Sequence, residues 1–166
     1  MTATPLTVWV DADACPGPIK EILVRAAQRR GVRTVFVANK HIALPDHPTL
    51  SSIRVGAGQD VTDAHIAEVA SPGDLAVTQD IPLAAQLVAK GVTAIDPRGE
   101  LYTAENVRER LSIRNFMNDL REDGVRTSGP AAFGGRASQA FANTYDRELT
   151  RALRDGAESL RERRSA

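Results

Sequence analysis

Five short apolar runs alternate with helical patterns over the first 95 residues of this 166-residue chain, and this alternation restricts the fold more than any other feature. Runs rich in Val, Ile, Phe and Thr predict buried strands, whereas apolar residues spaced three and four apart predict amphipathic helices. Such an alternation favours a parallel sheet, because each helix returns the chain across the sheet to begin the next strand. The predicted strands are residues 7–10, 34–38, 52–55, 74–78 and 92–95, and the helices between them are 19–30, 61–70 and 81–91.

The pattern changes after about residue 104, where two charged amphipathic helices are predicted at 105–123 and 137–153. The length of the chain suits one domain. We therefore expect an α/β fold over residues 1–153: a three-layer sandwich with a central, mostly parallel sheet of about five strands, helices on both faces and a C-terminal helical extension. The polar tail at 154–166 is expected to fray.

Composition limits the classes of function. Aromatic residues make up only 4% of the chain, so recognition of nucleic acid by rows of stacking side chains is not expected. The formal net charge is zero, which permits a local basic face but does not by itself indicate a nucleic-acid-binding protein. Cys15 is the only cysteine, which fits a reducing compartment. With no signal-peptide pattern and no long apolar run, we expect a soluble cytoplasmic protein without a membrane partner, and a homo-oligomer remains open.

Acidic residues follow the predicted strands at several connections. They are Asp11 and Asp13 after strand one, Asp60 and Asp63 at the helix after strand three, Asp80 after strand four and Asp96 after strand five. Because the carboxyl ends of parallel strands lie along one edge of the sheet, these connections bring carboxylates to the same edge. Gathered carboxylates repel one another unless a cation lies between them. An oxygen-only donor set favours Mg²⁺ or Mn²⁺, which suits hydrolysis of phosphate esters by metal-activated water.

Each acid also has a purely structural interpretation. Asp60 and Asp63 could cap a helix and complement its dipole, and Asp80 could shape a turn. Asp96, which precedes a proline, is better explained as a turn residue. The pair Asp11 and Asp13 is the hardest to explain in this way, because capping needs only one acid. Among other polar residues, Asn39 and Lys40 follow strand two and could reach the same edge.

The fragments "VDADACPGPIKEIL", "VFVANK", "VGAGQDVTDAHI", "GDLAVTQDIPLAAQLVAKG", "DPRGELYTAENV" and "RTSGPAAF…FANTYDREL" resemble, in this order, the bacterial YaiI/YqxD family, an uncharacterised group. The resemblance covers about residues 7–153. The family is grouped with PIN-like domains, which implies a nuclease-type acidic centre with Mg²⁺ or Mn²⁺. It implies that Asp11 is the first acid of the centre with Asp13 as its companion, that Asp63 and its neighbour Asp60 lie on the middle helix, and that Asp80 is the acid after strand four.

The C-terminal "GPAAF…F" segment resembles an extension of the same family, in which we expect a charged run. Here "GGRASQA" offers only Arg136, so the resemblance does not support phosphate contacts by this segment.

These observations favour a divalent-metal-dependent nuclease that acts on RNA or single-stranded nucleic acid. The expected metal ligands are Asp11, Asp60, Asp63 and Asp80, and the expected catalytic residues are Asp11, Asp13, Asp63 and Asp80, with Asp13 orienting a metal-bound water. Phosphate contacts are expected from Lys40, Arg114, Arg121 and Arg136.

Two alternatives stay open at this point. The same fold could serve as a non-catalytic module that binds RNA or a nucleotide. A phosphatase of the haloacid dehalogenase type would use Asp11 as nucleophile and Asp13 as general acid. It is the weaker alternative, because the later threonine, lysine and acidic pair of that class are missing in the required order. A response-regulator receiver lacks its lysine after strand five.

Overall fold

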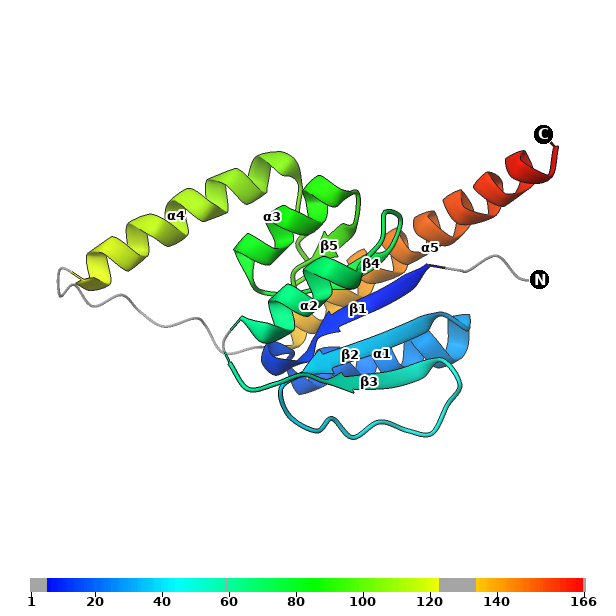
Figure 1. Ribbon diagram of the computed structural model, residues 1–166, viewed down its shortest axis with the longest axis horizontal. Coiled ribbons are helices and arrows are strands. Elements are labelled where there is room, and N and C mark those ends of the chain that lie inside the picture. The colour runs from blue at the N-terminus through cyan, green and yellow to red at the C-terminus, as the bar shows by residue number, and fades with distance from the viewer. Residues whose placement is uncertain (1–5, 59, 123–133, 166) are drawn as a thin grey trace.

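A five-stranded parallel sheet forms the centre of the molecule in a computed structural model that describes residues 6–58, 60–122 and 134–165 (Figure 1). The strands are β1 (Thr7–Asp11), β2 (Arg33–Ala38), β3 (Leu50–Arg54), β4 (Leu75–Val77) and β5 (Thr93–Ile95). They lie in the order β3-β2-β1-β4-β5, and each pair of neighbouring strands is parallel. The predicted α/β fold is confirmed. The ladders are wholly parallel where the sequence predicted a mostly parallel sheet.

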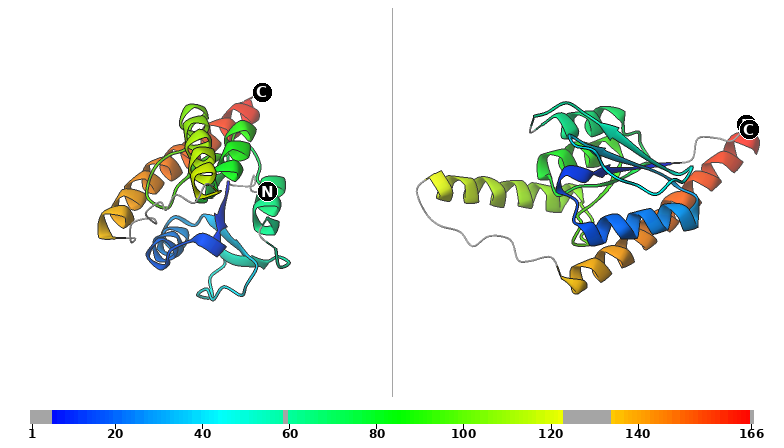
Figure 2. Two further views of the ribbon diagram at one scale, coloured as in Figure 1. Left: turned by 90° about the vertical axis from the view of Figure 1, so that its left-hand side faces the viewer. Right: turned by 90° about the horizontal axis from the view of Figure 1, so that it is seen from below.

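Helices cover both faces of this sheet, and the alternation of side chains along β1 explains why both faces are buried. Val8 and Val10 point to one face, where they join the cluster formed with α1 (Gly17–Arg30) and α5 (Gly135–Ser165). Trp9 points to the other face. The helices on that face are α2 (Val61–Val69), α3 (Ile81–Lys90) and α4 (Ala104–Glu122). Figure 2 shows α1 and α5 side by side in one helical layer. The sheet separates this layer from the layer of α2, α3 and α4.

Local signals fix most helix ends close to their predicted positions. Gly31 ends α1 at a φ of 63°, and Gly91 ends α3 at a φ of 87°, a left-handed conformation that glycine adopts without steric cost. Strand β3 differs most from its predicted bounds: it covers Leu50–Arg54, whereas residues 52–55 were predicted. None of the helices in the described ranges is long and apolar enough to cross a membrane.

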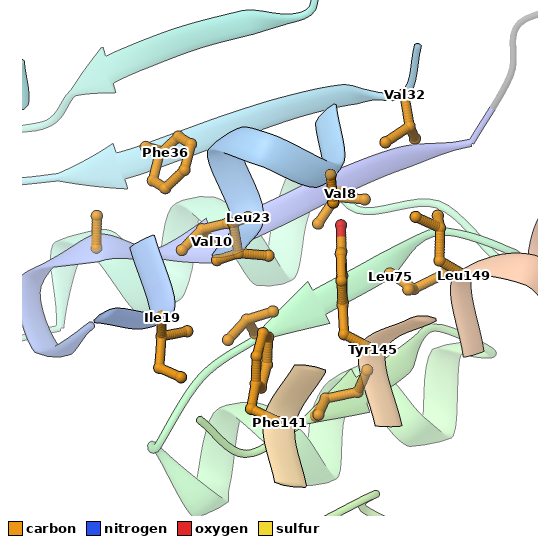
Figure 3. Packing of buried hydrophobic residues seen from close by; sticks show 14 of the residues in the cluster. Val8, Val10, Ile19, Leu23, Val32, Phe36, Leu75, Phe141, Tyr145 and Leu149 are labelled. Atoms are coloured by element: carbon orange, nitrogen blue, oxygen red, sulfur yellow. The ribbon is translucent and has the colours of Figure 1, made fainter. Parts of the chain in front are cut away.

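The C-terminal helix α5 closes one face of the sheet. Phe141, Tyr145 and Leu149 are almost fully buried against α1 and the strands, and the rings of Phe141 and Tyr145 stack at 5.4 Å between centroids (Figure 3). The helix is longer than predicted, because it continues past residue 153 to Ser165. The polar tail therefore forms its last turns, which extend beyond the body of the protein (Figure 1).

A buried carboxylate joins β1 and β4 at the amino end of the sheet. Asp74 accepts hydrogen bonds from the Thr7 backbone N–H at 3.0 Å, the Trp9 indole at 3.0 Å and the Ser71 backbone N–H at 2.9 Å. A carboxylate with three donors is satisfied without water or metal. Asp74 is thus a structural acid at the edge opposite to the one where the candidate functional acids lie.

Candidate functional site

Asp11 lies where β1 emerges at the carboxyl edge of the sheet. Its side chain is buried and accepts a hydrogen bond from the Thr78 hydroxyl at 2.9 Å. Burial raises the pKa of the Asp11 carboxyl; the Thr78 hydrogen bond opposes this effect, and the negative charges of Asp13 and Asp80 add to it. Ionisation of a carboxyl group in such surroundings is unfavourable in free energy, and a bound cation would offset this effect.

Asp13 follows in a short 3-10 turn (Ala12–Ala14) and faces a different set of groups. Its oxygens accept the backbone N–H of Asn39 at 3.0 and 3.2 Å, and Oδ2 also accepts the hydroxyl of Thr62 at 2.6 Å. Asp13 therefore connects the end of β2 and the start of α2 to β1. Asn39 was predicted to reach this edge of the sheet, and its backbone N–H does so by donating to Asp13. The Asn39 side chain makes no hydrogen bond within the described residues.

Asp63 and Asp80 meet between α2 and α3. Asp63 lies in the first turn of α2, and Asp80 is the N-cap of α3, where its Oδ1 accepts the Leu83 N–H at 2.7 Å. Burial raises the pKa of Asp63 to about 7, and the neighbouring Asp80 contributes through its charge and through a hydrogen bond between the two side chains. The charges of Asp11 and Asp60 act in the same direction. Asp63 therefore keeps its proton to a higher pH than an ordinary aspartate does.

The remaining predicted acids differ in their surroundings. Asp60 occupies the N-cap position of α2 and is exposed, but its side chain makes no capping hydrogen bond. Asp96 is buried and accepts the Arg98 backbone N–H at 2.7 Å, as expected of a turn residue, together with Arg110 Nη1 at 3.1 Å. Asp96 thus belongs to a separate ion-pair cluster next to the acids.

We define the acidic edge as Asp11, Asp60, Asp63 and Asp80, which influence one another through their charges. Their donor atoms are all carboxylate oxygens, which fit Mg²⁺ or Mn²⁺. Among the described residues, no three acidic, histidine or cysteine side chains are already close enough together to hold a metal ion. The chemistry of the donor set therefore fits a hard cation, but the carboxylates would have to draw together to bind it.

The predicted cationic residues are less informative. Lys40 is exposed just beyond β2, and Arg136 is exposed in the first turn of α5. Neither forms an ion pair within the described part of the chain. Arg114 and Arg121 lie along α4, but their side chains fall outside the described residues, as does the "GPAAF" segment at 129–133.

Sequence reasoning missed the two threonines that hold the acids. Thr62 and Thr78 are buried, and each directs its hydroxyl to one aspartate of the β1 pair. The Thr78 hydroxyl also accepts the Asp80 backbone N–H at 3.0 Å. A signal was present in "VTD" and "VTQD", where each threonine precedes an acid of the edge by one or two positions. His65 is half-buried, and its Nε2 atom has no hydrogen-bond partner among the described residues.

Comparison with known proteins gives a family match over most of the chain. The sequence profile described as "Uncharacterized BCR, YaiI/YqxD family" matches residues 9–151. A UPF0178 protein of Myxococcus xanthus (strain DK1622) is 60% identical over 149 residues, which cover 90% of this chain and 97% of that protein. A UPF0178 protein of Syntrophobacter fumaroxidans (strain DSM 10017 / MPOB) is 60% identical over 146 residues, 88% of this chain and 95% of that protein. No solved structure matched the chain.

Proposed function

The chain belongs to the YaiI/YqxD family, and we propose that it is a divalent-metal-dependent nuclease that hydrolyses RNA or single-stranded nucleic acid at the acidic edge. The observation that carries this proposal is the gathering of Asp11, Asp63 and Asp80 at the carboxyl edge of the sheet, where their negative charges act on one another. Within the described part of the chain, no lysine or arginine is among the groups that shift the pKa of Asp63 or Asp11. A divalent cation would supply the missing positive charge.

In this proposal Asp11, Asp63 and Asp80 would bind the ion. The exposed Asp60 would be a fourth ligand or would attract cations to the site. Mg²⁺ or Mn²⁺ bound there would supply an activated water and neutralise charge on the phosphate. Thr78 keeps the Asp11 carboxylate oriented through its 2.9 Å hydrogen bond. Asp13, which is held by the Asn39 backbone N–H and the Thr62 hydroxyl, would orient the water.

Nucleic acid is the proposed substrate because a nuclease needs cations for phosphate contacts, and two of the predicted ones, Lys40 and Arg136, are exposed on separate elements. Lys40 follows β2 and Arg136 begins α5, so phosphates on either side of a scissile bond could contact them. Such contacts release counterions, and binding should therefore weaken as salt rises.

The test is a calorimetric titration of Mn²⁺ into the wild type, Asp11→Asn and Asp46→Asn, followed by incubation of each protein with single-stranded RNA. Asp46 is an exposed acid of the loop between β2 and β3 and serves as the matched control. We expect binding and cleavage in the wild type and in Asp46→Asn, and loss of both in Asp11→Asn. Unchanged binding and cleavage in Asp11→Asn would contradict the proposed site.

A non-catalytic module for RNA or a nucleotide is the second candidate, and one observation favours it. Oxygens of Asp13 and Asp80 are already used by backbone and hydroxyl donors, which lowers their availability to a metal ion. RNA binding by the wild type that persists in EDTA, without cleavage in Mn²⁺, would identify this function.

A further inference from the structure

Tyr102 lies beneath the start of α4, next to the acidic edge. Its ring is buried, and its hydroxyl lies 3.1 Å from the Thr78 carbonyl oxygen and 3.2 Å from Asp96 Oδ2. Burial raises the pKa of this hydroxyl, and the charge of Asp96 raises it further. The hydroxyl therefore stays protonated, as a hydrogen-bond donor, throughout the physiological pH range.

Arg110 holds Tyr102 in this position from the side of α4. The guanidinium lies 5.0 Å from the centre of the Tyr102 ring, donates to Asp96 Oδ2 at 3.1 Å and pairs with Glu100. A planar cation over an aromatic face combines electrostatic attraction with stacking. The ring is thus fixed by contacts from its face as well as from its hydroxyl.

Thr78 is the residue through which Tyr102 reaches the acids. The ladder between β4 and β5 ends at Val77, and the Thr78 backbone N–H makes one further bond, to the Ile95 carbonyl at 3.1 Å. The Thr78 carbonyl lies beyond this ladder, and the Tyr102 hydroxyl, whose single proton is shared with Asp96 Oδ2, supplies a donor for it. With both backbone groups held, the Thr78 side chain can contact Asp11 at 2.9 Å and the Asp80 backbone N–H at 3.0 Å.

We infer that Tyr102 is a positioning residue of the acidic edge, which it orders by fixing Thr78 between Asp11 and Asp80. The consequence for metal affinity rests on the proposed function, whereas the ordering of Thr78 and Asp80 does not. The same contacts join α4 to the site, because Arg110 belongs to that helix. A displacement of α4 would therefore reach the acids through Arg110, Tyr102 and Thr78.

The test compares Tyr102→Phe with Tyr145→Phe. Tyr145 is an equally buried tyrosine on the opposite face of the sheet, and its hydroxyl has no hydrogen bond of normal geometry to any described residue. Each substitution removes one buried hydroxyl and keeps the ring, so the pair separates the position of the hydroxyl from its general effect on stability. The two measurements are amide hydrogen exchange at Asp80 by NMR and the affinity for Mn²⁺ by calorimetry.

In Tyr102→Phe we expect amide exchange at Asp80 to become about tenfold faster and Mn²⁺ to bind about tenfold more weakly, as the loss of one hydrogen bond implies. In Tyr145→Phe both values should stay within twofold of the wild type. Equal exchange at Asp80 in the two variants would overturn the inference. If the wild type binds no Mn²⁺, the proposed function fails, while the exchange comparison still decides the role of Tyr102.

Should Tyr102→Phe fail to fold, Arg110→Lys gives the same test. It keeps the positive charge and removes the planar group over the ring, so a smaller increase in Asp80 exchange is expected. No increase in Asp80 exchange in this folded variant would overturn the inference.

Discussion

The carboxyl group of Asp63 makes the stability of the protein depend on pH in an unusual direction. Its pKa is raised to about 7 in the folded state, whereas an unfolded chain has an Asp pKa near 4. Between these values Asp63 binds more protons in the folded state than in the unfolded state, so its contribution to the free energy of unfolding decreases as pH rises from about 4 to about 7. The stabilising contribution is complete below pH 4 and is lost above pH 7.

Asp63→Asn should remove most of this dependence. In EDTA we expect the variant to exceed the wild type in free energy of unfolding by about 1 kcal/mol at pH 8 and by much less at pH 5, since solvent screens a half-buried group. Urea unfolding at both pH values measures the difference. Asp46→Asn, an exposed acid, should follow the wild type at each pH. A difference between Asp63→Asn and the wild type that is the same at pH 5 and at pH 8 would show that the pKa of Asp63 is not raised in the folded state.

Much of the acidic edge could be predicted at the level of single residues. The topology of a parallel sheet brings Asp11, Asp63 and Asp80 to one edge, and their sequence positions were sufficient for this prediction. The orientation of Asp13 could not be predicted in the same way. It depends on a 3-10 turn and on Thr62, which is 49 positions away in the sequence. The hydrogen-bond partners of Asp13 thus come from distant parts of the sequence, whereas the place of the acids at this edge follows from the alternation of strands and helices.

At the scale of elements, a single glycine controls how α5 approaches the loop after β5. Gly99 has a φ of 96°, and a Cβ atom there would lie 2.5 Å from the carbonyl carbon of Ala140 in α5. The Thr144 hydroxyl also donates to the Gly99 carbonyl at 2.6 Å. Backbone atoms cannot move aside without shifting the whole helix, and the φ value adds strain for any other residue.

Gly99→Ala should therefore lower the free energy of unfolding by about 2–4 kcal/mol, from backbone strain and overpacking together. Thermal and urea unfolding give the value. Gly156→Ala is the matched control, because Gly156 lies inside α5 with open space around it. That substitution should keep stability unchanged or raise it by up to about 1 kcal/mol. Equal stability of the two variants would mean that α5 does not pack against the loop as closely as described.

The length of α5 shows that apolar periodicity does not predict where a helix ends once it no longer packs against the protein. Apolar periodicity predicted α5 only to residue 153, because its buried positions end near Leu149 and Leu153. The helix continues on charged residues, and Arg154 and Glu158 are four positions apart, a spacing that supports a solvated helix. Periodicity detects the face that a helix buries, so it does not detect turns that bury nothing. Whether these turns fray in solution stays a prediction.

At the scale of the whole molecule, the two faces of the sheet carry different groups of residues. The face covered by α2 and α3 carries Asp63 and Asp80, and α4 joins the same layer through Arg110. The face covered by α1 and α5 holds the other apolar cluster, with Phe141, Tyr145 and Leu149 at its centre (Figure 3). Substitutions that lie far apart on the two faces should therefore add in their effects on stability.

This division predicts how much of α5 the fold requires. Leu149 is 1% exposed, and Leu149→Ala should lower the free energy of unfolding by about 2–5 kcal/mol through the cavity it leaves. Removal of residues 154–166 should change it by less than about 0.5 kcal/mol, because the described side chains of that stretch are exposed. Urea unfolding of the two variants makes the comparison, and Mn²⁺ titration of the shortened chain should match the wild type. A large loss of stability on truncation would mean that the last turns of α5 pack against a surface, such as that of a second copy, which the isolated chain does not provide.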